Sequence, residues 1–161
     1  MKFGIGQPVT RKEDPRFLTG CGQYVDDIEI PNLAYGYVLR SIHANATINS
    51  IDVSLAKKAP GVIEVLTGQD YASDGIGNIS CESINPMLSK GEPQLRPHPA
   101  LVTGVVKCIG APVAFVVAET LALAKDASEL ISIDYIVLPS VTSISEVRKP
   151  DASIVWEGTK N

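Results

Sequence analysis

The sequence has few of the residues from which metal centres and disulfide frameworks are usually built. It contains two histidines, His43 and His98, and three cysteines, Cys21, Cys81 and Cys108. The cysteines are odd in number and far apart, so they form neither a closed disulfide framework nor a Cys-x-x-Cys clamp. The histidines stand in unrelated contexts. We therefore expect reduced cysteines and no zinc-type site.

Long apolar runs and an excess of positive charge are also missing. The longest apolar run, residues 109–118, is broken by Gly110 and Pro112 and falls short of the ~20 residues that span a bilayer. The first residues lack the apolar segment of a secretory signal. A formal net charge of -4 argues against a nucleic-acid partner, since such a partner requires clustered basic residues. These features predict a cytoplasmic protein that binds neither membranes nor nucleic acid.

The residues that are present have the composition of a globular domain, with 45% hydrophobic and 20% charged residues. Glycine and charge dominate an extended leader at 1–32, and a core is expected at 33–148. A tail follows at 149–161. Within the core, residues 72–99 are rich in glycine and proline and predict a long loop, of the kind that often binds a ligand or partner.

The pattern of apolar residues predicts a strand-rich core with short helices. Strands are expected at 33–42, 48–53, 61–67, 105–109, 113–118 and 131–137. The strand at 113–118 is apolar on both faces, so it should be central in its sheet. Turns are expected at 67–70 and 110–112.

Three helices are expected. Thr120 can cap a helix at 121–130, and Ser143 with Glu146 forms a capping-box pattern for a second. A brief helix at 55–58 could be capped by Asp52 or Ser54. The predicted apolar face of the helix at 121–130 contains Leu121, Ala124, Ala127, Ser128 and Ile131, and Lys125, Asp126 and Glu129 should face solvent.

Two Gly-x-Gly pairs in the leader, Gly4 with Gly6 and Gly20 with Gly22, invite a phosphate-loop interpretation. A dinucleotide fingerprint requires a third glycine between a strand and a helix, and position 25 is Val25. The context favours turn geometry for these glycines.

The leader contains two acidic and two basic residues that could form a catalytic acid-base set. They are Arg11, Glu13, Asp14 and Arg16. Charges that alternate in sign along a polar segment usually pair with one another, so a structural role is favoured. Asp26 and Asp27 could bind a hard cation, but adjacent side chains of an extended segment point to opposite sides. Turn capping is the better interpretation of this pair.

Cys21, between two glycines, is the best candidate for a reactive thiol, with His43 as its base. Such a pair needs hydrogen-bond contact and an orienting third group, and nothing in the sequence places the two together. Cys108 lies in an apolar strand and is expected in the core. Cys81 is unassigned. We therefore predict no catalytic, cofactor-binding or metal-binding residue in this chain.

A series of motifs resembles one enzyme family. The segment GQPVTRKEDPRFLTGCGQYVDDI at 6–28 is similar to the opening of the large, molybdenum-binding subunit of the xanthine dehydrogenase/aldehyde oxidase family, including carbon monoxide dehydrogenase-like members. Further similar motifs follow in order at 39–48, 51–56, 59–62, 65–70, 110–114, 116–120, 124–130, 134–135 and 138–139. The resemblance implies an α/β-hammerhead domain, an α+β fold. Ala111 departs from the acidic residue that is common there in the family, which affects a local polar contact but should leave the turn intact.

The resemblance also implies a role. In this family the molybdenum-pterin cofactor, the catalytic residues and the substrate pocket lie in domains after the hammerhead domain. Iron-sulfur and FAD centres lie in partner subunits or domains. The chain is thus expected to be a non-catalytic domain of an oxidoreductase that hydroxylates an aldehyde, an N-heterocycle or carbon monoxide, and to be inactive in isolation. The alternatives are a free-standing binding or assembly module that uses the long loop, and a thiol enzyme that uses Cys21.

Overall fold

A computed structural model of the chain describes residues 6, 8–80, 96 and 98–156. The chain divides into two compact units, Met1–Leu33 and Ala34–Asn161. None of the helices in the described residues has both the length and the apolar composition needed to span a lipid bilayer.

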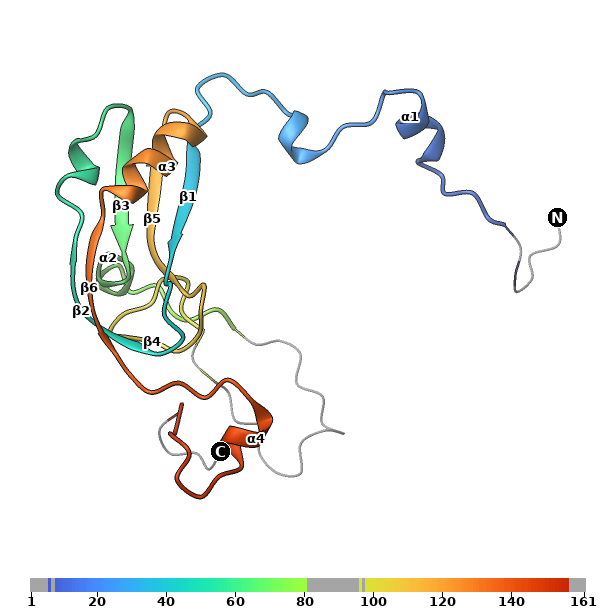
Figure 1. The fold of residues 1–161 in the computed structure, drawn as a ribbon. Helices are drawn as coiled ribbons and strands as arrows, with labels where there is room; N and C mark the ends of the chain where they lie inside the picture. The colour runs from blue at the N-terminus through green and yellow to red at the C-terminus, as the bar shows by residue number, and fades with distance from the viewer. Residues whose placement is uncertain (1–5, 7, 81–95, 97, 157–161) are drawn as a thin grey trace. The chain divides into compact units, whose positions relative to one another are not determined.

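The first unit contains two short helical stretches, α1 (Asp14–Leu18) and the 3-10 helix η1 (Val25–Asp27) (Figure 1). The sequence predicted an extended leader, and these turns interrupt it. Pro15 lies in the first turn of α1, where its fixed φ suits a helix and its missing N–H leaves no donor unpaired. At η1, a carboxylate oxygen of Asp27 accepts a hydrogen bond from the backbone N–H of Tyr24 at 2.8 Å.

The second unit is built on two three-stranded antiparallel sheets. Sheet A has the order β1 (Tyr35–Arg40), β5 (Pro112–Ala118) and β3 (Val62–Thr67). Sheet B has the order β4 (Val105–Val106), β2 (Ala46–Asp52) and β6 (Ser132–Val137). The central position predicted for the apolar strand at 113–118 is confirmed, because β5 pairs with β1 on one side and β3 on the other.

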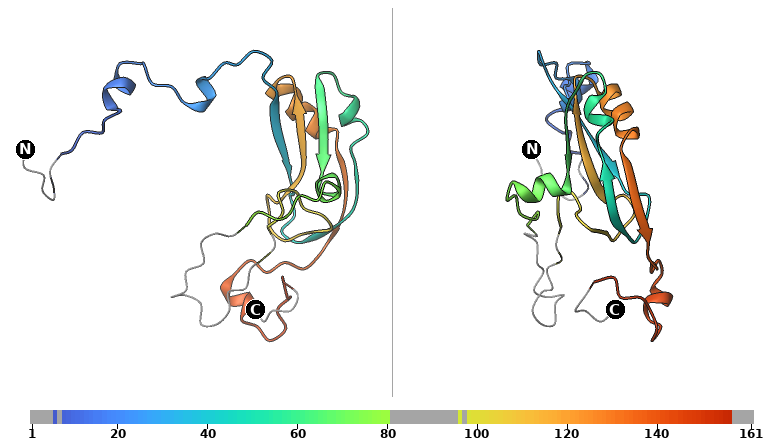
Figure 2. Two further views of the ribbon diagram at one scale, coloured as in Figure 1. Left: turned by 180° about the vertical axis from the view of Figure 1, so that it is seen from behind. Right: turned by 90° about the vertical axis from the view of Figure 1, so that its left-hand side faces the viewer.

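Helix α3 (Leu121–Glu129) lies on one face of sheet A (Figure 2). The predicted cap is confirmed, since the Thr120 hydroxyl accepts a hydrogen bond from the Leu123 N–H at 3.2 Å. Ala124, Ala127 and Ser128 are buried as expected. Leu121 is exposed instead, and Leu123 packs against the core in its place.

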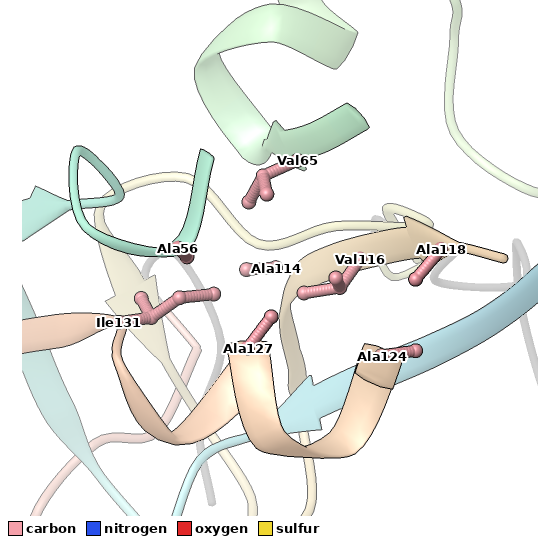
Figure 3. Close-up of a cluster of buried hydrophobic side chains, with 8 residues drawn as sticks. All are labelled: Ala56, Val65, Ala114, Val116, Ala118, Ala124, Ala127 and Ile131. Carbon is pink, nitrogen blue, oxygen red and sulfur yellow. The ribbon is translucent and has the colours of Figure 1, made fainter. Parts of the chain in front are cut away.

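The main core cluster lies between sheet A, α3 and the 3-10 helix η2 (Ala56–Lys58) (Figure 3). Most of its buried side chains are small, which lets the backbone of α3 approach the sheet closely. The buried residues are Ala56, Val65, Ala114, Val116, Ala118, Ala124, Ala127 and Ile131. A second, smaller cluster contains Ala46, Val106, Ala111 and Val113.

Three local predictions were wrong. The turn expected at 67–70 is the start of helix α2 (Gly68–Ser73), for which Thr67 and Asp70 form a capping box. Neither Asp52 nor Ser54 caps η2, because the N-cap residue is Leu55 and no side chain bonds to the first turn; the Asp52 carboxylate instead accepts a bond from the Ser54 N–H at 2.9 Å. The strand expected at 105–109 ends at Val106, so Cys108 lies in the following turn and is exposed rather than buried.

The remaining local predictions concern the second half of the chain. Helix α4 (Ile144–Val147) begins at the predicted cap, with the Ser143 hydroxyl accepting a bond from the Glu146 N–H. The Glu146 carboxylate reaches back to Thr142, one residue before the cap. Most of the long loop expected at 72–99 lies outside the described residues. Its described ends meet where Ile79 N–H donates to the His98 carbonyl at 2.8 Å.

Candidate interaction surface

The leader glycines have the turn geometry that the sequence favoured. Gly6 and Gly20 adopt positive φ angles of 83° and 75°, which residues other than glycine rarely adopt. Gly22 lies against the ring of Phe17, where a Cβ atom would collide with ring carbons. Gly4 lies outside the described residues.

The leader charges make local structural contacts. Arg11 Nε lies 2.9 Å from Asp14 Oδ1, and the Arg11 N–H donates to the other oxygen of the same carboxylate at 3.2 Å. The Arg16 guanidinium lies 5.4 Å from the centre of the Phe17 ring. In the part of the chain that the structure describes, no three His, Cys, Asp or Glu side chains gather into a group that could hold a metal ion. Asp27 caps η1 by accepting the bond from the Tyr24 N–H, as predicted.

Cys21 and His43 belong to different units of the chain. The Cys21 Sγ lies 3.8 Å from the carbonyl oxygen of Thr19. The His43 ring packs edge-on against Tyr135 with centroids 4.9 Å apart. Cys81 lies outside the described residues.

An open pocket of about 410 Å³ lies beside His43 and Tyr135, between the end of β1 and β6. The pocket is lined mainly by apolar side chains, and its charged or titratable groups are Arg40, His43 and Tyr135. Arg40 Nη1 donates a hydrogen bond to the Gly110 carbonyl at 2.8 Å, which ties the end of β1 to the turn before β5. No carboxylate or thiol lines the pocket, so no acidic side chain there orients the His43 imidazole and no thiol nucleophile stands beside it.

The turn around Ala111 is intact, as the sequence predicted. Ala111 is buried, and its carbonyl accepts a bond from the Ser41 N–H at 2.8 Å. The Gly110 N–H donates to the Ser41 carbonyl, also at 2.8 Å. This pair of backbone bonds extends the contact between β1 and β5.

Sheet A has a second face, opposite α3, that we call the outer apolar face. It contains Val38, Leu66, Phe115 and Val117. Val38 and Leu66 are the cross-strand partners of Phe115, so the three form a row across the sheet. All four side chains are half-buried. The alternation of side chains along β5 produces this face, because Ala114, Val116 and Ala118 point into the core.

The rim of the outer apolar face carries an ion pair between Lys57 Nζ and Glu64 Oε1 at 3.1 Å. A hydrogen bond from the Val65 N–H, and then the Lys57 ammonium, hold the pKa of Glu64 below its usual value. Local hydrogen bonds likewise lower the pKa of Asp52, Asp70 and Glu146. A general acid at neutral pH needs a raised pKa, which none of these four carboxyls has. These four carboxyls are therefore held ionised by structural hydrogen bonds and ion pairs.

Comparisons with known proteins identify the domain. Residues 19–139 match the family model described as aldehyde oxidase and xanthine dehydrogenase, a/b hammerhead domain. The carbon monoxide dehydrogenase large chain of Afipia carboxidovorans is 37% identical over 160 residues, which cover 98% of this chain and 18% of that relative. The xanthine dehydrogenase of Dictyostelium discoideum is 33% identical over 145 residues, covering 90% of this chain and 10% of the relative.

Solved structures show the same fold. Quinoline 2-oxidoreductase from Pseudomonas putida 86 superposes with a TM-score of 0.78 at 38% identity, over 94% of this chain and 19% of the other. A Cu,Mo-CO dehydrogenase superposes with a TM-score of 0.74 at 37% identity, over 93% and 18%. The chain thus spans less than a fifth of the length of these relatives. The predicted α/β-hammerhead fold is confirmed, and the chain belongs to the aldehyde oxidase and xanthine dehydrogenase family as its α/β-hammerhead domain.

Proposed function

We propose that this chain is the non-catalytic N-terminal domain of a molybdenum-dependent hydroxylase or dehydrogenase large subunit. The observation that carries the proposal is the match of 98% of this chain to only 18% of a carbon monoxide dehydrogenase large chain. On this proposal, the complete enzyme hydroxylates an aldehyde, an N-heterocycle or carbon monoxide. The remaining domains of the large subunit supply the molybdenum-pterin cofactor.

The described side chains do not form a cluster that suits that cofactor's metal. Among them there is no group of three or more His, Cys, Asp or Glu that could hold a metal ion. The same residues contain no buried side-chain nitrogen or oxygen without a hydrogen-bond partner, as an unfilled polar ligand site would leave. The described residues therefore offer no group that would ligate the metal of this cofactor, and we assign no reaction step to them.

The proposed role is to support the cofactor domains by packing against them. The outer apolar face supports this role, because partly exposed Val, Leu and Phe side chains gain free energy when a second surface removes them from water. Iron-sulfur and FAD subunits or domains are the further proposed partners. The absence of membrane and nucleic-acid partners and the cytoplasmic location remain predictions from the sequence.

Co-purification from the native host tests the proposal. The chain is expressed there with an affinity tag, and molybdenum in the eluted fraction is measured by inductively coupled plasma mass spectrometry. We expect molybdenum to elute with the tagged chain together with a polypeptide whose sequence continues the family's large subunit. The tag expressed alone is the control. Elution of the chain without molybdenum, or with an unrelated ligand held by the loop at 72–99, would refute the proposal.

A further inference from the structure

The first unit exposes apolar side chains that it cannot bury by itself. None of the described residues from 8 to 33 is buried. Leu18 in α1 is 87% exposed and Val25 in η1 is 83% exposed. Single exposed apolar residues are ordinary on protein surfaces. Their number and grouping therefore decide whether they indicate an interaction site.

The exposed apolar residues of the first unit are grouped. Tyr24, Val25, Ile28 and Ile30 are all exposed and fall within seven consecutive residues. Val9 and Leu18 precede them. A contiguous group of this kind marks an interaction site more often than scattered single residues do. We call residues 9–30 the docking segment.

The docking segment nevertheless has a defined local shape. The rings of Phe17 and Tyr24 stack with centroids 5.2 Å apart and planes at 27°, and Gly22 fits against the Phe17 ring. The ion pair of Arg11 with Asp14 closes the turn before α1. Helices of five and three residues are too short to be stable alone in water. A surface that receives the segment would therefore both bury its apolar side chains and stabilise its turns.

The comparison with a relative indicates which surface this is. The match to the Afipia carboxidovorans large chain covers 98% of this chain, so it includes nearly all of the first unit. The matched part is 18% of that relative and leaves 82% of the relative's chain outside the alignment. In that relative the matched segment therefore belongs to a much longer polypeptide, whose remaining part is large enough to offer a surface for it.

We propose that the docking segment packs on the molybdenum-cofactor domains of the same large subunit, with Leu18 and Val25 as its anchors. This inference rests on the proposed function and names the surface that makes the contact. A few side chains that become fully buried carry most of the free energy of an interface, while neighbouring contacts mainly exclude water. Leu18 and Val25 are the two most exposed aliphatic side chains of the segment, so they have the most apolar surface to remove from water.

Site-specific photo-crosslinking in the native host tests the contact directly. Leu18 or Val25 is replaced with the photo-crosslinking residue p-benzoylphenylalanine in the tagged full chain. Leu121, exposed at the start of α3, is the matched control position. We expect crosslinks from positions 18 and 25, but not from 121, to peptides of the molybdenum-containing polypeptide, identified by mass spectrometry.

A charge substitution gives an independent readout. We expect Leu18→Asp to reduce the molybdenum that co-purifies per chain by about tenfold to a hundredfold, the loss typical of a buried interface anchor. Leu121→Asp should leave it unchanged. Because Leu18 is not buried, both variants should keep the melting temperature of the parent chain.

The outcomes separate this inference from the proposed function. If molybdenum still co-purifies with the chain but positions 18 and 25 give no crosslinks, the proposed contact of the docking segment is refuted and the proposed function stands. Crosslinks to a second copy of this chain would overturn that contact in favour of self-association. Loss of all molybdenum from the parent chain would refute both.

Discussion

The two faces of β5 lead to a prediction that compares adjacent valines. Val116 is fully buried against α3, whereas Val117 is half-buried on the outer apolar face. Replacing Val116 with alanine removes two buried carbon groups, worth about 1.6 kcal/mol at ~0.8 kcal/mol for each. A residual cavity of roughly 40 Å³ adds about 1 kcal/mol. We therefore expect Val116→Ala to lower the free energy of unfolding by about 2.5 kcal/mol.

The matched control is Val117→Ala. We expect it to lower the free energy of unfolding by less than about 1 kcal/mol, because the Val117 side chain is already partly hydrated. For a chain of this size, Val116→Ala should lower Tm by about 5–10 °C. Thermal melting followed by circular dichroism, and urea unfolding with unchanged m values, measure both variants. An equal or larger loss for Val117→Ala would refute the assignment of the two faces.

Two further perturbations test the capping box of α2 and the contact around Trp156. The Asp70 pKa is lowered because its carboxylate accepts bonds from the Thr67 hydroxyl and N–H. The Asp70 carboxylate therefore contributes to the free energy of unfolding above the unfolded pKa of ~3.9. This contribution is lost as the pH falls through the lower pKa of the folded state. We expect Asp70→Asn to lower the free energy of unfolding by about 1 kcal/mol at pH 7 and by little at pH values below the folded pKa. An equal loss at both pH values, measured by urea unfolding, would contradict this. Lys107 Nζ lies 4.5 Å from the Trp156 ring centre, and this is the single tryptophan. Lys107→Ala should hydrate the ring and shift its fluorescence emission to longer wavelength, whereas an unchanged spectrum would show that the contact does not shield it.

Patterns that depend on neighbouring residues were enough to predict much of the fold. The apolar run at 113–118 indicated a central strand, because burial on both faces leaves no polar alternation. Thr120 and Ser143 were recognised as caps, since their hydroxyls satisfy nearby N–H groups whatever surrounds them. The start of α2 was missed, although Thr67 and Asp70 stand at the same spacing as Ser143 and Glu146. Gly68 directly follows the cap, and glycine is more typical of a turn than of the first turn of a helix.

Properties set by distant contacts could not be predicted in this way. Cys108 was expected in the core because its neighbours are apolar, but β4 ends at Val106 and leaves the thiol in an exposed turn. The outer apolar face depends on the register that places Val38 and Leu66 opposite Phe115, and register is not readable from one strand alone. The family, in contrast, was recognised from the order of many motifs.

The strand order also constrains how the domain forms during synthesis. Neither sheet pairs strands that are consecutive in the chain. Tyr35 of β1 pairs with Ala118, and Ala46 of β2 pairs with Val106 and Val137, all of which are synthesised much later than their partners. At a ribosome, β1, β2 and β3 would therefore emerge without partners, and pairing over such separations is slow. Unpaired strands are prone to aggregate, so we expect the yield of folded protein to depend on how soon residues 112–137 leave the ribosome.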